Sequence, residues 1–93
     1  MNWNERVLAD RSLTTTARQL VDTISRYFAN TAAGYATFHD YELGGLIGVS
    51  AAQIRAARLE LEERNFLRPL RPHGRPRYRL CLGYARAEDD EAA

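Results

Sequence analysis

The stretch ELGGLIGVSAAQIRAARLELEERNFL, residues 42–67, decides the fold of this chain. It predicts a short helix, a tight turn at Gly48 and a second helix. Ser50 stands just before the second helix, where a serine hydroxyl accepts hydrogen bonds from backbone amides that lack a partner inside the helix. Val49, between the turn and this cap, is expected to enter the core. The chain should therefore fold around two short helices joined by a tight turn.

The first of these helices, residues 41–48, contains two adjacent glycines. Each glycine costs a helix about 1 kcal/mol relative to alanine. We therefore expect Gly44 and Gly45 to lie where the two helices cross closely and a side chain would not fit. Asp40 is the expected N-cap of this helix. Four apolar residues of the helix are expected to point inward: Tyr41, Leu43, Leu46 and Ile47.

The second helix, residues 51–64, is predicted to have a narrow apolar face. At about 100° per residue, three residues share that face: Ile54, Ala57 and Leu61. Two residues break the pattern, because Arg58 occupies a core position and Leu59 points away from the core. Either the helix is rolled to bury Leu59, or Arg58 lies along the edge of the core and reaches for a phosphate group.

Upstream, the sequence predicts a scaffold helix over residues 17–30. The threonines at positions 14–16 are candidate N-caps, while Asn30 and Gly34 are candidate stop signals. The apolar residues of this helix fall at helical spacing: Ala17, Leu20, Val21, Ile24, Tyr27 and Phe28. The helix should therefore lay one apolar stripe on the core. A very short strand is expected after it, at residues 36–38.

Residues 1–12 are predicted to form an N-terminal arm or short helix. Trp3, Val7 and Leu8 stand at helical spacing, so such a helix would have one apolar edge. Two alternatives are open for that edge: it packs on its own domain, or it contacts a second copy of the chain. In either case a large aromatic residue such as Trp3 is expected to be buried.

Downstream, residues 66–70 and 77–82 predict the two strands of a hairpin, joined by a loop around residues 72–75. In the second strand, apolar residues alternate with polar ones, as in a half-buried strand: Tyr78, Leu80 and Leu82. The hairpin is also rich in arginine: Arg68, Arg71, Arg75, Arg77 and Arg79. So much positive charge in one hairpin repels itself unless a polyanion neutralises it.

The charge of the chain is unevenly distributed. Residues 1–49 carry four arginines against five acids, a net of −1, and residues 50–86 carry nine against three, a net of +6. Residues 87–93 carry four acids, which brings the total to +1. A basic segment favours a polyanionic partner, because local potential counts more than net charge. All 13 cations are arginine, a residue suited to bidentate contacts with phosphate and guanine, although codon usage in a GC-rich genome explains the lack of lysine equally well.

We expect one domain at residues 13–85, preceded by the arm and followed by an acidic, disordered tail at residues 86–93. Because Cys81 is the only cysteine, we expect no intrachain disulfide and no cysteine-based zinc site. A reducing, intracellular setting is the expected location of the chain. No apolar run approaches the roughly 20 residues of a membrane span. The two histidines are far apart and no glycine-rich phosphate loop occurs. We therefore expect neither an enzyme nor a bound metal or cofactor.

The order of helix, helix-turn-helix and hairpin over residues 13–82 resembles the winged helix-turn-helix superfamily. The shared motifs are an L-x-x-x-A-R start, an aromatic residue before the second helix, an L-x-x-x-x-G-V-S turn and an L-E-E-x-x-F-L exit into the hairpin. They fall here on Leu13, Ala17 and Arg18, on Phe38, on Leu43, Gly48, Val49 and Ser50, and on Leu61, Glu62, Glu63, Phe66 and Leu67. Within the superfamily, the chain is similar to winged-helix domains of phage and plasmid replication or regulatory proteins. It departs from them at Arg58 and at Asn65, which replaces a common glycine but tolerates the left-handed backbone.

The resemblance implies sequence-specific binding of double-stranded DNA by a transcriptional repressor that occludes a promoter, in the cytoplasm of a prokaryotic or phage-infected cell. Helix 51–64 would enter the major groove, and the hairpin would act as a wing on the backbone or in the adjacent minor groove. Gln53 would pair with adenine and Arg55 with guanine. The expected DNA contacts are Ser50, Ala52, Gln53, Arg55, Arg58, Arg68, Arg71, His73, Arg75, Arg77 and Arg79.

Two questions about partners stay open in the sequence. A homodimer would form through the N-terminal arm or the scaffold helix, because no long helix suited to a coiled coil is present. The alternative to a DNA-binding regulator is a protein-interaction module, or a replication or partition accessory module of a mobile element. The alanine-rich helix 51–64 and the outward Leu59 favour this alternative.

Overall fold

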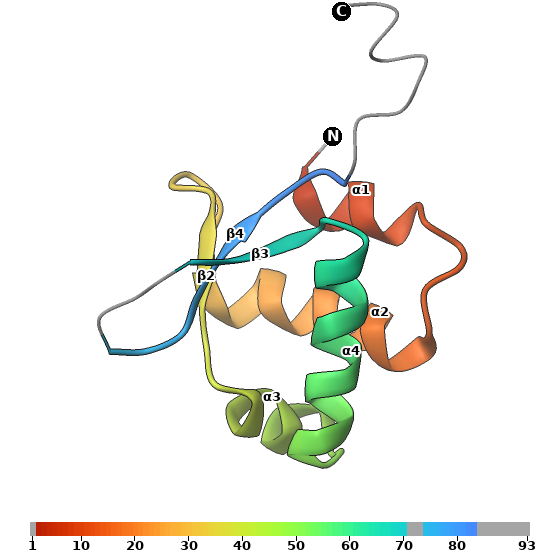
Figure 1. The fold of residues 1–93 in the computed structure, drawn as a ribbon, viewed down its shortest axis with the longest axis vertical. Coiled ribbons are helices and arrows are strands. Elements are labelled where there is room, and N and C mark those ends of the chain that lie inside the picture. Colours follow the sequence, from red (N-terminus) through yellow and green to blue (C-terminus); the bar gives the residue numbers. More distant parts are fainter. Residues whose placement is uncertain (1, 71–73, 84–93) are drawn as a thin grey trace, which may run out of the picture.

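The computed structural model describes residues 2–70 and 74–83. A short helix α1 (Trp3–Leu8) precedes α2 (Thr15–Thr23), which continues into a π-helical segment η1 (Ile24–Phe28). Two short strands, β1 (Ala29–Asn30) and β2 (Tyr35–Thr37), lead to the paired helices α3 (Asp40–Ile47) and α4 (Ala51–Glu63). The hairpin strands β3 (Leu67–Leu70) and β4 (Arg77–Leu80) follow (Figure 1). This order confirms the predicted α+β fold class, with three main helices, a C-terminal hairpin and an additional N-terminal helix.

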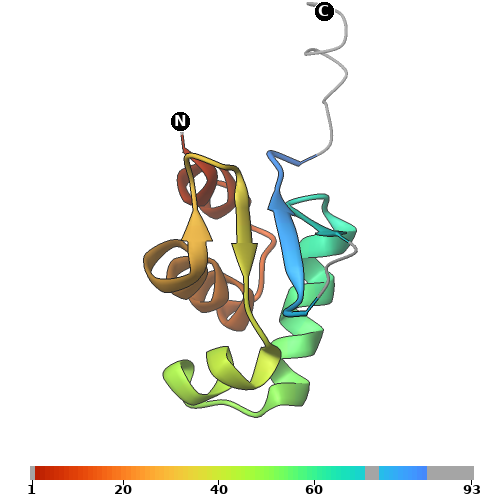
Figure 2. The ribbon, with the colours of Figure 1, turned by 90° about the vertical axis from the view of Figure 1, so that its left-hand side faces the viewer.

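The four strands form one antiparallel sheet in the order β1-β2-β4-β3. Its helices lie on one side, and the other side is open in the part of the chain that the structure describes (Figures 1 and 2). Tyr78 of β4 pairs with Ala36 of β2 and Pro69 of β3, and both Tyr78 and Ala36 are buried against the helices. Strand β2 begins one residue earlier than predicted, and β1 was not predicted, because two residues carry no recognisable strand pattern.

Helix α2 begins where the sequence predicts but does not end as a regular α-helix. Thr14 caps it, since its hydroxyl accepts a hydrogen bond from the Ala17 amide at 3.2 Å. Past Thr23 the backbone widens into η1, where the Ala29 amide donates to the carbonyl of Ile24, five residues back. A π-helical turn breaks the α-helical spacing of side chains. The prediction that Tyr27 belongs to the apolar stripe is therefore wrong, and its side chain is 66% exposed.

The predicted N-cap of α3 is also wrong. The cap is His39, whose backbone amide donates to the Glu42 carboxylate at 2.7 Å, while the Asp40 carboxylate bonds to Arg58. Only one face of this short helix is buried, and it consists of Leu43, Gly44 and the half-buried Ile47. Two of the four residues expected to point inward flank that face and are exposed, namely Tyr41 at 67% and Leu46 at 57%.

The two glycines of α3 have different surroundings. A Cβ atom on Gly44 would lie 2.7 Å from the backbone carbonyl oxygen of Val49, at the turn into α4. A Cβ atom on Gly45 would meet nothing within 4 Å. The expected close approach of α3 and α4 is thus confirmed at Gly44, and no such approach exists at Gly45. Gly48 ends α3 in the left-handed conformation, at φ 87°, which places the turn where the sequence predicts it.

Alanine at these two positions should have opposite effects on stability. Gly44→Ala is expected to lower the free energy of unfolding by about 1–3 kcal/mol, because the methyl group presses on a backbone oxygen that cannot rotate away. Gly45→Ala is expected to raise it by up to about 1 kcal/mol through helix propensity alone. Urea denaturation of both variants beside the parent chain measures the difference. A Gly44→Ala variant as stable as Gly45→Ala would contradict the close contact at the turn.

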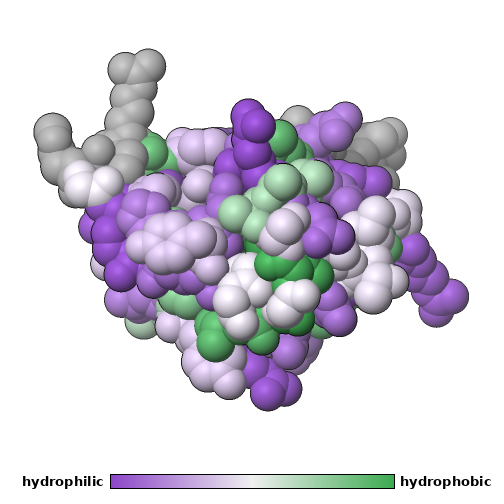
Figure 3. Space-filling model, turned by 90° about the horizontal axis from the view of Figure 1, so that it is seen from below, coloured by the Kyte–Doolittle hydropathy of each residue, from purple (hydrophilic) through white to green (hydrophobic). Residues whose placement is uncertain are grey.

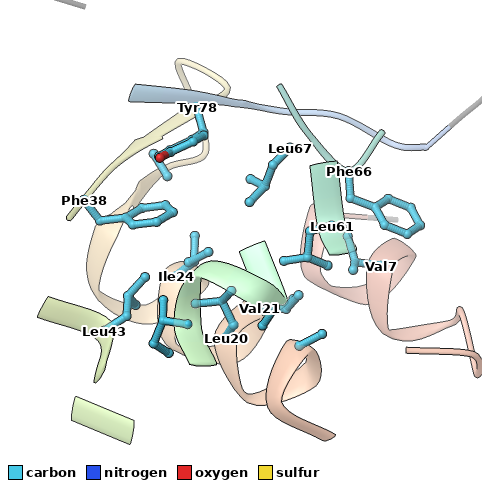
Figure 4. Packing of buried hydrophobic residues seen from close by; sticks show 14 of the residues in the cluster. Val7, Leu20, Val21, Ile24, Phe38, Leu43, Leu61, Phe66, Leu67 and Tyr78 are labelled. Atoms are coloured by element: carbon cyan, nitrogen blue, oxygen red, sulfur yellow. The ribbon is translucent and has the colours of Figure 1, made fainter. Parts of the chain in front are cut away.

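The core lies between the helices and the inner side of the sheet. Helices and strands both contribute side chains to it (Figure 4). The helices supply Leu20, Val21, Ile24, Leu43 and Leu61, and the sheet and the residues next to its strands supply Phe38, Leu67 and Tyr78. Phe38 and Tyr78 stack with their ring centroids 4.6 Å apart. All three residues of the predicted apolar face of α4 are buried: Ile54, Ala57 and Leu61. Asn65 leaves α4 with a positive φ of 59°, as expected for an asparagine in place of glycine.

Helix α1 packs on its own domain. Trp3 is buried, and its indole Nε1 donates to the carbonyl oxygen of Phe66 at 2.9 Å. Val7 is fully buried, and the Arg6 Nε donates to the carbonyl oxygen of Leu82 at 3.1 Å. The first of the two alternatives for the arm is thus confirmed, and these two apolar residues are already covered. Within residues 2–70 and 74–83, no helix has the length and hydropathy needed to cross a membrane.

Candidate nucleic-acid interface

Helix α4 turns a line of small side chains outward. Ala52 and Ala56 are exposed, on the side of the helix opposite the buried Ile54 and Ala57. Arg55 stands beside them, also exposed, and no hydrogen bond or ion pair to another described residue holds it. With side chains this short, another molecule can approach the backbone of α4 closely, and Arg55 supplies the one long cationic side chain.

Gln53 is held at the start of α4. The Ser50 hydroxyl accepts a hydrogen bond from the Gln53 amide at 3.1 Å, and the Gln53 Oε1 accepts in return from the Ser50 amide at 3.0 Å. This reciprocal pair satisfies amides at the helix end, which confirms Ser50 as the cap. A glutamine that reads adenine uses both its carbonyl and its amino group. Because the carbonyl already bonds to Ser50, Gln53 has only its amino group to offer.

Arg58 is the most enclosed cation of the site, with its side chain 14% exposed. Its Nε and Nη2 donate to the two carboxylate oxygens of Asp40 at 2.9 and 3.1 Å, and Nη1 donates to Glu62. The guanidinium also lies 5.6 Å from the centre of the Tyr78 ring. Burial opposes the positive charge, but the hydrogen bonds to Asp40 and Glu62 outweigh it and raise the pKa of Arg58.

This geometry decides between the two sequence alternatives for α4. The helix is not rolled to bury Leu59, which is 44% exposed. Arg58 does lie along the edge of the core, but it bonds to carboxylates instead of facing open solvent. It joins α4 to the first residue of α3 and to the ring of Tyr78 in β4. We therefore leave Arg58 out of the candidate interface and treat it as a residue that positions α4.

In the loop that joins the two hairpin strands, Arg75 forms an ion pair with Glu42 of α3. Glu42 also accepts a hydrogen bond from the His39 amide. That bond, assisted by Arg75, lowers the pKa of Glu42 in spite of its partial burial. The pair links the hairpin to α3, while about half of the Arg75 side chain stays exposed. Arg75 can therefore contact a phosphate only by sharing or exchanging its carboxylate partner.

Three further arginines lie on the open side of the sheet, and we call them the sheet arginines: Arg68, Arg77 and Arg79. Arg68 and Arg79 are direct partners across the β3–β4 ladder. The Arg77 guanidinium lies 4.6 Å from the centre of the Tyr35 ring, a cation–π distance. None of the three forms an ion pair with any residue in 2–70 or 74–83.

The predicted contact residues do not form one surface. Ala52, Gln53 and Arg55 lie on or beside the outward side of α4, whereas the sheet arginines lie on the open side of the sheet. In Figure 2, which looks toward β2 and β4, helix α4 lies at the side of the view and not in front of the sheet. Two expected contacts, Arg71 and His73, lie outside the described residues, as does the expected acidic tail at residues 86–93.

Sequence reasoning predicted the exposure of Leu59 but missed that of two apolar residues of α3. Leu46 and Tyr41 of α3 and Leu59 of α4 are among the large apolar side chains most exposed to solvent. Seen from below, apolar side chains gather where α3 and the start of α4 lie (Figure 3). Leu82 is exposed too, so the predicted alternation of buried residues in the second strand fails at its last member.

The pocket and the acidic side chains outside this interface do not point to a second kind of site among the described residues. An open pocket between α1 and the end of α4 is lined by both charge signs, including Asp10 and Arg64, which pair with each other at 3.4 Å. Hydrogen bonds from Ser12 lower the pKa of Asp10. Across residues 2–70 and 74–83, no three His, Cys, Asp or Glu side chains lie close enough to hold a metal ion.

No family model, curated protein or solved structure matches this chain.

Proposed function

We propose that this chain is a winged helix-turn-helix protein that binds double-stranded DNA, with the outward side of α4 in the major groove and hairpin arginines on phosphates. The observation that carries the proposal is the distribution of arginine partners. Arg26, Arg58, Arg64 and Arg75 are paired with acids. Of the described arginines without an ion pair to an acid, Arg55 and the sheet arginines are the ones on α4 and the hairpin, and a cation without an acid beside it favours a polyanion.

The shape of α4 suits a groove. The major groove is wide enough for a helix whose first turns approach the base edges, and the alanines at positions 52 and 56 leave room for that approach. Arg55 would pair with guanine in bidentate fashion, and Gln53 would donate one hydrogen bond from its amino group. With so few base readers, most of the affinity would come from phosphate contacts, and specificity would be modest.

A repressor is the simplest regulatory form of the proposal. A domain that covers a promoter blocks transcription by occlusion, which would take place in the cytoplasm. Winged-helix regulators often gain specificity by pairing on half-sites. If this chain pairs through its arm or α2, the contact has to use residues other than Trp3 and Val7, because both are buried in the domain itself.

Placing acids on α4 tests the groove contact. The double variant Ala52→Glu/Ala56→Glu puts two carboxylates on the exposed side, where they fit the helix but repel phosphates. Duplex affinity should fall by at least about tenfold, because opposed like charges at an interface cost several kcal/mol. The matched control is Thr31→Glu/Ala32→Glu, which makes the same charge change in the exposed β1–β2 turn. Fluorescence anisotropy with a labelled duplex gives both affinities.

Two results would overturn the proposal. One is a parent chain that does not bind duplex DNA at low salt. The other is an α4 variant that binds as tightly as its control, because this would show that α4 does not face the DNA. Both variants keep their exposed positions, so circular dichroism should confirm that each still folds.

A second candidate function is a protein-interaction module, including an accessory role in replication or partition of a mobile element. The observation that favours it is the exposure of three large apolar side chains on α3 and α4, namely Leu46, Tyr41 and Leu59. Exposed apolar side chains that form a contiguous patch mark interaction sites. If Leu46→Ser abolishes binding to a partner protein while the α4 acids leave duplex binding unchanged, this second function is favoured.

A further inference from the structure

The strand register places two arginines of the hairpin directly opposite each other. Arg68 of β3 pairs with Arg79 of β4, and Tyr35 of β2 pairs with Arg79 from the other side. Residues paired in this way point to the same side of a sheet. Tyr78 and Leu67, the strand neighbours of these two arginines, are buried, so the row with the two arginines points outward. Like charges directly opposite across a ladder destabilise the sheet.

The whole open side of the sheet has the same character. Its outward positions hold Asn30 and Tyr35, Thr37 and Arg77, Arg79 and Arg68, and Leu70. None of these residues is acidic. The Arg77 guanidinium carbon lies 4.6 Å from the centre of the Tyr35 ring, so the ring helps to hold the cation on this side of the sheet. In the part of the chain that the structure describes, three guanidinium groups on one side of the sheet are therefore placed to donate hydrogen bonds to one anionic partner.

This sheet surface is separate from α4. The buried residues of α4 and the buried Tyr78 pack in the same core, so the outward sides of the helix and of the sheet point away from that core in different directions. Figure 2 shows the strands toward the viewer, with α4 behind and below β4. A rigid duplex lying along α4 would meet the edge strand β3, whereas Arg77 and Arg79 belong to β4, the next strand inward.

We propose that the open side of the sheet is a second DNA-contacting surface, on which the sheet arginines bind the phosphate backbone of a duplex segment other than the one on α4. The inference rests on the proposed function and divides its phosphate contacts: Arg55 and Arg75 stay with the duplex on α4, and the sheet arginines bind the other segment. One folded chain then holds two duplex segments together. A repressor of this kind would join distant sites or condense DNA in addition to covering a promoter. Phosphate contacts carry no sequence information, so the second segment need have no particular sequence.

A two-duplex capture experiment tests this. One duplex is fixed to beads, the full chain is bound to it, and a second fluorescent duplex is added and washed. The parent chain should retain the second duplex. Arg68→Gln/Arg79→Gln should retain about tenfold less or lower, because two phosphate contacts are lost, yet still bind the fixed duplex. The matched control, Arg11→Gln/Arg26→Gln, removes the same charge from exposed positions elsewhere and should capture like the parent.

Light scattering on each protein separates this account from a dimer that uses two α4 surfaces. A dimer of that kind would still capture the second duplex in Arg68→Gln/Arg79→Gln, and this result would overturn the inference. Capture of a single-stranded but not of a double-stranded second segment would overturn it as well. If the parent chain binds the fixed duplex and captures nothing, only the inference fails. If the parent binds no duplex at all, the proposed function fails with it.

A measurement without DNA gives an independent check. If Arg68 and Arg79 repel each other across the ladder, the double glutamine variant should unfold at a urea concentration no lower than the parent chain does. A clear loss of stability would show that the two arginines hold the hairpin together. In that case their placement has a structural cause, and the inference falls.

Discussion

Replacing Arg58 with alanine is expected to lower the free energy of unfolding by about 3 kcal/mol, the lower end of the cost of breaking a buried ion pair. The substitution leaves the carboxylates of Asp40 and Glu62, each about one-fifth exposed, side by side without a cation. It also removes the bonds that join α4 to α3. The expected loss is large for a domain of this size, because small domains have only about 5–15 kcal/mol of stability in total.

Arg55→Ala is the matched control for this prediction. Arg55 has the same side chain on the same helix, but it is exposed, so its loss should change stability by no more than about 0.5 kcal/mol. Adding Asp40→Asn to Arg58→Ala should cost less than the sum of the two single changes, since the unpaired charge is then gone. If urea denaturation gives the same stability for Arg58→Ala and Arg55→Ala, the ion-pair network contributes nothing to the fold.

Much of the fold could be predicted because its signals are local. A serine before an alanine-rich helix, a glycine at the turn and a threonine before the scaffold helix each satisfy a helix end, and Ser50, Gly48 and Thr14 stand where the sequence places them. The apolar face of α4 was equally predictable, because a 13-residue helix is long enough to show its period.

The errors occur where distant residues override local preference. Asp40 is a good N-cap by type, yet Arg58, 18 residues later, takes its carboxylate. Tyr27 follows the helical spacing, yet a π-helical turn moves it outward. Neither the ion pair of Asp40 with Arg58 nor the π-helical turn can be recognised in a sequence segment of about a dozen residues. The pairing of Arg58 with Glu62 was not predicted either, although two opposite charges four residues apart on a helix are a recognisable local signal.

The candidate site was predictable in composition but not in arrangement. Counting charges identified the basic hairpin, and helical spacing identified Arg55 as exposed. Only the strand register shows that Arg68 and Arg79 share the open side of the sheet, apart from α4. Register depends on how β2, β3 and β4 come together across the chain. The sequence alone therefore merges two surfaces into one.

The dependence of duplex binding on salt carries the second large expected effect. If α4, Arg55 and the sheet arginines together contact about six phosphates, the affinity for duplex DNA should fall about 10³-fold between roughly 50 and 200 mM salt, because each contact releases condensed counterions. The physical reason is independent of DNA sequence, so any duplex of sufficient length can serve.

That salt titration tests the central claim most directly. Affinity is measured by anisotropy at several salt concentrations for the parent chain and for Arg55→Gln, and log K is plotted against log salt. We expect a straight line with a slope of about −5 for the parent and a shallower one for the variant. Failure to bind at the lowest salt, or binding that is insensitive to salt, would contradict the view that these arginines bind DNA.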